Sequence, residues 1–187
     1  MELRNIEFYG TPNGAVMIQE MDQPVKVYDQ GYKDFTDMMI EHLSNFYPEA
    51  FKALSEHYAA SKQNPGYYQF LIVHRFIRCN WDKYDNVQDV DHNGVFKFEF
   101  VSCPLRGECK HCGIICSPKF NSNLTERELG VMRLYYESET PETIAERLFI
   151  SPMTVLKHKR NSLAKLGLHS VKDFISYASR NKLFDNE

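Results

Sequence analysis

Three helix-start signals follow one another in the last third of this sequence. Thr125 and Glu128 have the spacing of a capping box, in which a hydroxyl and a carboxylate satisfy free amides at a helix start. Thr140-Pro141 and Ser151-Pro152 each place a capping residue before a proline, which is favoured in the first helical turn. Apolar residues then recur at helical spacing. The sequence therefore predicts three short helices in close succession.

The third helix is expected to run from 152 to about 166, because Gly167 suits the left-handed conformation just beyond a helix end. This segment contains no acidic residue, and its basic residues are Lys157, Lys159, Arg160 and Lys165. Binding to a polyanion requires such a local excess of positive charge, since binding releases condensed counterions. Two short helices joined by a tight turn, the second of them basic, are typical of a helix-turn-helix.

The same stretch resembles the C-terminal DNA-binding domain of LuxR-type transcriptional regulators. That family pattern has LT-x-RE at its start, IA-x-x-L in the second helix, S-x-x-TV-x-x-H in the third, and KL-G at its end. The matching residues here are Leu124-Thr125-Glu126-Arg127-Glu128, Ile144-Ala145 with Leu148, Ser151 with Thr154-Val155 and His158, and Lys165-Leu166-Gly167. The resemblance covers about the last third of the chain. It implies a fourth helix that closes the bundle and carries dimer contacts.

Two positions depart from the family pattern. A basic residue usually follows the Thr-Val pair, where this sequence has Leu156, so the DNA contact expected at that position comes into question. An apolar residue usually lies four residues after His158, where this sequence has Ser162. Either Leu163 supplies the packing in its place, or the third helix is slightly re-oriented.

We expect the third helix to read bases in the major groove of double-stranded DNA. Lys157, Arg160 and Asn161 share a helical phase, and arginine pairs with guanine and asparagine with adenine through two hydrogen bonds. The remaining polar residues fit phosphate contacts, which position the protein without specifying sequence. His158 has a second interpretation, as a packed residue. The full set predicted at the DNA is Ser151, Thr154, Val155, Lys157, His158, Lys159, Arg160, Asn161 and Lys165.

The rest of the chain predicts a second domain. We expect an α+β domain over 1–119 that senses a signal or mediates assembly, followed by an all-α, four-helix helix-turn-helix domain over 120–187. Residues 94–101 alternate three phenylalanines with other side chains, which predicts a half-buried strand. The other elements expected in this domain are short strands within 1–31 and helices over 32–46, from Pro48, and over 67–81, where a buried strand is the alternative.

Four cysteines with the spacing C-x5-C-x2-C-x3-C occupy a loop-like segment just before the domain boundary; they are Cys103, Cys109, Cys112 and Cys116. Thiolates this close suit zinc or an iron–sulfur cluster, with His111 as a substitute ligand. The spacing matches neither the usual zinc ribbon nor the ferredoxin run. The alternatives are that they are small packing residues, or that Cys109 and Cys112 form a redox switch. Cys79 is interpreted as a packing residue.

The function that these patterns favour is sequence-specific transcription regulation by a homodimer, with RNA polymerase as a further partner and no catalytic residues. The runner-up is a protein like region four of a sigma factor. Such a protein would need an upstream helical region that melts promoter DNA with a basic and aromatic helix. The residues before Phe120 are instead acidic, with 12 Lys and Arg against 16 Asp and Glu. A metal- or redox-responsive thiol protein is the alternative from another class.

A location in the cytoplasm is expected. The N-terminus, MELRNIEFYG, is polar and mixed and does not resemble a signal peptide. No apolar run is long enough to span a membrane, so no membrane partner is expected.

Overall fold

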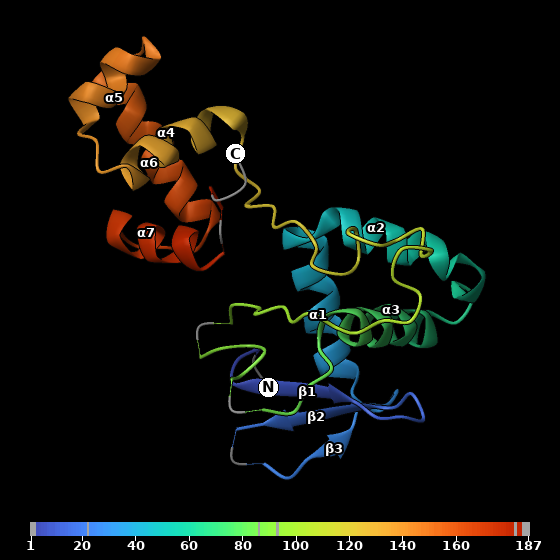
Figure 1. Ribbon diagram of the computed structural model, residues 1–187. Coiled ribbons are helices and arrows are strands. Elements are labelled where there is room, and N and C mark those ends of the chain that lie inside the picture. Colours follow the sequence, from blue (N-terminus) through green and yellow to red (C-terminus); the bar gives the residue numbers. More distant parts are fainter. Residues whose placement is uncertain (1–2, 22, 86, 93, 182, 185–187) are drawn as a thin grey trace. The chain divides into compact units, whose positions relative to one another are not determined.

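The computed structural model describes residues 3–21, 23–85, 87–92, 94–181 and 183–184. The chain divides into two compact units, Met1–Lys119 and Phe120–Glu187. Figure 1 shows the first in blue to yellow-green and the second in yellow to red. Each unit has its own hydrophobic core, and we call them the N-terminal and the C-terminal unit.

The N-terminal unit opens with a small antiparallel sheet. Its described strands are β1 (Ile6–Gly10), β2 (Val16–Glu20) and β3 (Lys26–Val27), in the order β1-β2-β3. Phe8 lies opposite Ile18, and both side chains are buried. The short strands predicted within 1–31 are therefore confirmed.

Helix α3 packs against β1 and β2 of this sheet, and α1 packs against α3 (Figure 1). The helical elements of the N-terminal unit are α1 (Lys33–Phe46), α2 (Pro48–His57), the 3-10 turn η1 (Ala59–Ser61) and α3 (Pro65–Asn80). The apolar run over 67–81, for which a buried strand was the alternative to a helix, belongs to α3. Asn64 caps this helix, its side chain accepting the amide of Tyr67, and Pro65 follows in the first turn. A capping residue followed by a proline is typical of a helix start, and this start explains why the segment forms a helix of sixteen residues and not a strand.

The strand predicted over 94–101 is wrong. The backbone of this segment pairs with another segment at one isolated antiparallel bridge, between Phe96 and Val90, and does not form a continuous strand. The amide of Lys97 donates to the Asp89 carbonyl at 2.8 Å, and the Lys97 carbonyl accepts the indole N–H of Trp81 at 2.7 Å. Phe100 is 68% exposed, so the alternating phenylalanines do not share one buried face. The segment is an irregular cover on the core, held by individual hydrogen bonds.

The C-terminal unit is helical over its described residues. Its helices are α4 (Glu126–Tyr136), α5 (Pro141–Leu148), α6 (Pro152–Lys165) and α7 (Val171–Arg180). The three predicted helix starts are confirmed: Thr125, Thr140 and Ser151 each accept a backbone amide at the first turn. All four helices contribute to one core, which includes Met132, Ile144, Val155 and Phe174.

Candidate nucleic-acid interface

The turn between α5 and α6 orients the candidate DNA-binding helix. Phe149 follows α5 with φ +54°, and this left-handed residue ends the helix and reverses the chain. Ser151 then caps α6, its Oγ accepting the amide of Thr154 at 3.1 Å. A short helix, a tight turn and a capped second helix together make the helix-turn-helix geometry.

One face of α6 is fixed in the core. Val155 and Ser162 lie two helical turns apart and have no exposed surface. Val155, which was predicted among the residues at the DNA, packs in the core of this unit. Leu163 packs against the same core, which is the first of the two alternatives given for the departure at Ser162. The Ser162 hydroxyl is buried there, with no hydrogen-bond partner among the described residues.

The opposite face of α6 is exposed within the described residues of the C-terminal unit. Met153 is 75% exposed, and Leu156, Lys157 and Arg160 are also exposed, while Asn161 is half-buried at the margin. Because this helix has no acidic side chain, every charged side chain on its outward face is positive. Lys157 and Arg160, predicted to read bases, therefore lie together on the outward surface.

Other predicted DNA contacts already have protein neighbours. The ammonium of Lys159 lies 5.7 Å from the centre of the Tyr135 ring, a cation–π distance. His158 and Thr154 are half-buried. Lys165 donates a hydrogen bond to Glu128 at 2.6 Å, so its ammonium joins α6 to the start of α4. These side chains hold α6 in place in addition to any role at DNA.

Glu128 is the centre of that junction. One of its oxygens accepts the amide of Thr125 at 2.9 Å, and its own amide donates to the Thr125 hydroxyl, which completes the capping box. Burial alone raises the pKa of this carboxyl, but hydrogen bonds from Lys165 and Thr125 outweigh it and hold the pKa below its ordinary value. The capping box was predicted from spacing, whereas the cation that neutralises it comes from a distant helix.

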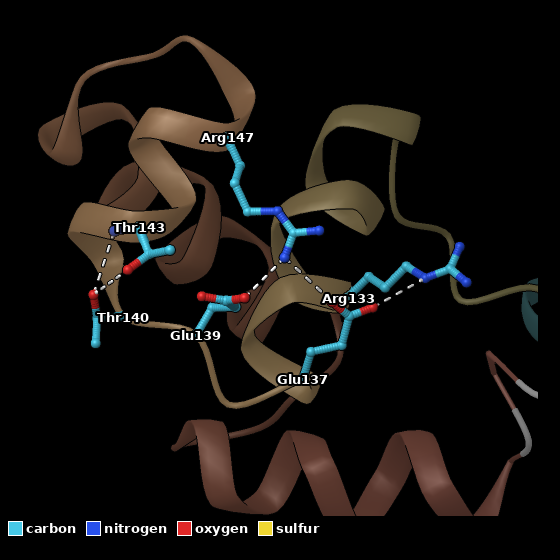
Figure 2. Close-up of polar contacts among 6 residues, drawn as sticks. All are labelled: Arg133, Glu137, Glu139, Thr140, Thr143 and Arg147. Carbon is cyan, nitrogen blue, oxygen red and sulfur yellow. Dashed lines mark hydrogen bonds and ion pairs between the residues drawn. The ribbon is translucent and has the colours of Figure 1, made fainter.

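A second ionic group fixes α5 against the end of α4 (Figure 2). The guanidinium of Arg147 lies 2.8 Å from Glu139 and 3.6 Å from Glu137. Arg133 also pairs with Glu137, at 3.6 Å along α4. Each exposed pair contributes little on its own. Together they tie the first helix of the helix-turn-helix to the turn before it.

The cysteine segment lies against the C-terminal end of α3. Asn80 is fully buried, and its amide group donates to the Ile115 carbonyl at 2.9 Å and accepts the Ser117 amide at 2.8 Å. These two bonds bracket Cys116 and hold it beside the last turn of α3. Sequence reasoning missed this anchor, because a lone asparagine at a helix end gives no signal of a partner 35 residues away.

Cys79, interpreted as a packing residue, belongs to the same neighbourhood. Burial raises the pKa of its thiol to about 11; the positive charge of Arg75 acts against this, and Cys116 and Cys103 add to the rise. All five cysteines are free thiols. Among the described residues, no three His, Cys, Asp or Glu side chains already form a group that could hold a metal ion. The metal site predicted at the cysteine segment therefore stays a prediction.

A helix-turn-helix whose second helix is basic and free of acidic residues is typical of DNA-binding domains. Residues 122–178 match the family described as bacterial regulatory proteins of the luxR family and form a domain of that family. The N-terminal unit lies outside this match.

Relatives match over a similarly short stretch. Fimbriae Z protein of Salmonella typhimurium is 40% identical over 60 residues, which is 32% of this chain and 29% of that protein. Oxygen regulatory protein NreC of Staphylococcus aureus is 39% identical over 62 residues, which is 33% of this chain and 29% of that protein. The similarity thus spans less than a third of the length of these relatives. No solved structure matches the chain.

Helices long and apolar enough to cross a membrane were not found within the described part of the chain.

Proposed function

We propose that this protein is a sequence-specific DNA-binding transcription regulator that inserts α6 into the major groove. The observation that carries the proposal is the outward face of α6, where Lys157 and Arg160 are exposed on a helix without acidic residues. Positive charge supplies attraction to phosphates, and arginine supplies the donor pair that guanine accepts in the major groove. The luxR-family match over 122–178 supports the same function.

The proposal extends to assembly and partners. A single helix-turn-helix touches few bases, and a homodimer that reads two half-sites is the common remedy. The ring of Tyr177 on α7 packs against Phe120 of the same unit at 5.7 Å. We place the dimer in the cytoplasm on double-stranded DNA, with RNA polymerase as a further partner. The N-terminal unit would sense a signal or mediate assembly.

Selection from a random duplex library tests the proposal. The full chain should enrich one sequence pattern, and its affinity for the selected duplex should fall steeply as salt rises. A footprint on that duplex should cover two half-sites about one helical turn, or a multiple of it, apart. Enrichment of no pattern, with equal affinity for all duplexes, would remove sequence-specific regulation as the function. A footprint over one half-site would remove the dimer alone.

We further propose zinc or an iron–sulfur cluster at Cys103, Cys109, Cys112 and Cys116. The supporting observation is that Asn80 clamps the end of this segment onto α3, next to the additional thiol of Cys79. Such a site would stabilise the irregular segment that precedes the C-terminal unit, because metal-binding free energy adds to folding free energy.

A further inference from the structure

Two large apolar side chains lie on the face of α6 that is proposed to enter the major groove. Met153 is 75% exposed and Leu156 is 40% exposed, whereas Val155 of the same helix is buried in the core of the C-terminal unit. Scattered exposed apolar residues need no explanation. Here, however, both lie on one face, and Leu156 stands where a basic residue is usual in LuxR-type domains.

Helix geometry makes these two residues neighbours of the proposed base-reading residues. Residues three and four apart adjoin on a helix surface, so Met153 lies next to Leu156 and Lys157. Arg160 follows one turn further, next to both. Val155 and Ser162, which are buried, mark the opposite side of the helix. The outward face is therefore a strip that combines apolar contact area with positive charge.

We infer that Met153 and Leu156 contact the C5-methyl groups of thymines, and that thymine adjoins the base pair read by Arg160 in the target sequence. The inference rests on the proposed function. The thymine methyl is the apolar group that base edges present in the major groove of ordinary DNA, and apolar side chains read it.

Charge selects DNA over a protein as the occupant of this strip. A protein surface that covered Met153 and Leu156 would also have to desolvate Lys157 and Arg160, which costs free energy unless each cation is paired. The α6 helix itself offers no carboxylate to either cation. Duplex DNA meets both requirements, because phosphates and guanine edges take the cations while thymine methyls take the apolar side chains.

Replacement of thymine by uracil tests the inference, since uracil lacks only the methyl group. The full chain is measured by fluorescence anisotropy on its selected duplex and on duplexes with one uracil each. At one or two positions in each half-site, uracil should weaken binding about fourfold, because burial of one methyl contributes about 0.8 kcal/mol. Met153→Ala and Leu156→Ala should each bind the selected duplex more weakly and lose the uracil effect at the position that the replaced side chain contacts.

Leu105→Ala is the matched control, because Leu105 is exposed to a similar extent but belongs to the N-terminal unit. It should leave the uracil effect intact. Uracil without effect at every position, or a uracil effect that persists in both α6 variants, would overturn the inference but leave the proposed function standing. If no duplex is bound selectively at all, the proposed function fails together with it.

Discussion

The ammonium of Lys165 lies 2.6 Å from a carboxylate oxygen of Glu128, the residue that closes the capping box of α4. This contact joins the last turn of α6 to the first turn of α4. Glu128 has 5% of its surface exposed, so Lys165 is the cation that makes burial of its charge tolerable. The orientation of the proposed DNA-reading helix thus depends on a charge at its far end.

Replacement of Lys165 by glutamine should lower the free energy of unfolding of the C-terminal unit by about 1 kcal/mol. A hydrogen bond to a charged group contributes up to about 3 kcal/mol, but the Lys165 side chain is 41% exposed and solvent weakens the pair. Urea unfolding at neutral pH measures the change. Lys172→Gln is the control, because Lys172 is an exposed lysine on α7.

Acid should remove this difference. The folded pKa of Glu128 lies below its ordinary value of 4.5, so its contribution is present above pH 4.5 and is lost as the pH falls through the folded pKa. A Lys165→Gln deficit that stays constant to the lowest pH at which the protein folds would contradict the assigned role. If Lys165 also contacts a phosphate, the same variant will reduce the salt slope of DNA binding by about 1.

Ser162→Ala should stabilise the C-terminal unit. The Ser162 hydroxyl is buried without a hydrogen-bond partner, and such a group costs about 1–3 kcal/mol. A gain of about 1 kcal/mol raises the unfolding midpoint of a domain this small by about 4–8 °C, which calorimetry resolves. Ser176→Ala on α7 makes the same change at an exposed helix position. A Ser162→Ala variant no more stable than Ser176→Ala would show that the hydroxyl has a partner in solution.

Asp89 should make the N-terminal unit less stable as the pH rises. Burial is the main cause that raises the pKa of this carboxyl to about 9, and the nearby acids Glu7, Glu99 and Asp85 add to it. The unfolded chain releases this proton near pH 3.8, so between pH 3.8 and about 9 the folded form binds more protons. The stability contributed by Asp89 therefore falls with rising pH, by at most about 1.4 kcal/mol per pH unit.

Asp89→Asn should abolish that dependence, because the amide is neutral and its oxygen can still accept the Phe8 amide that now bonds to Asp89 at 2.7 Å. Urea unfolding at several pH values between 5 and 9 compares the variant with the parent protein. Asp37→Asn, at an exposed position of α1, is the control for a lost surface charge. Parallel stability curves for the parent and Asp89→Asn would show that Asp89 is ionised throughout.

Local signals in the sequence were sufficient to predict the helices of the C-terminal unit. A cap such as Thr125 or Ser151 acts within one helical turn, so its effect can be read from neighbouring residues. The predicted strand over 94–101 failed because a strand needs a partner along its whole length, and this segment pairs only at Phe96, by an isolated bridge to Val90. Alternation along the chain does not reveal whether such a partner exists.

For the candidate site too, the sequence predicted some features and missed others. The basic residues of α6 could be named from spacing, and the structure brings Lys157 and Arg160 to one surface. The contact between Glu128 and Lys165 spans 37 residues and could not be inferred from either neighbourhood. Cys79 was interpreted as a packing residue, because the hydrogen bonds by which Asn80 holds the cysteine segment beside the end of α3 also span a long stretch of chain.

Elemental analysis of protein purified without oxygen tests the metal site. We expect one equivalent of zinc with Zn–S distances near ~2.3 Å, or iron with visible colour, and less metal in Cys109→Ser and Cys116→Ser. Chelation should lower the stability of the N-terminal unit, because the bound metal contributes folding free energy. Substoichiometric metal in the parent protein, with unchanged stability in both variants, would leave these cysteines as packing residues.

Methylation interference on the selected duplex tests most directly whether α6 reads the major groove. A methyl group on guanine N7 blocks the acceptor that Arg160 is proposed to use. We expect interference at a guanine in each half-site for the parent protein. In Arg160→Ala, which should lose about 1–3 kcal/mol on this duplex, we expect no interference at that guanine. Interference confined to adenine N3 in the minor groove, or an equal affinity loss of Arg160→Ala on selected and random DNA, would contradict the account.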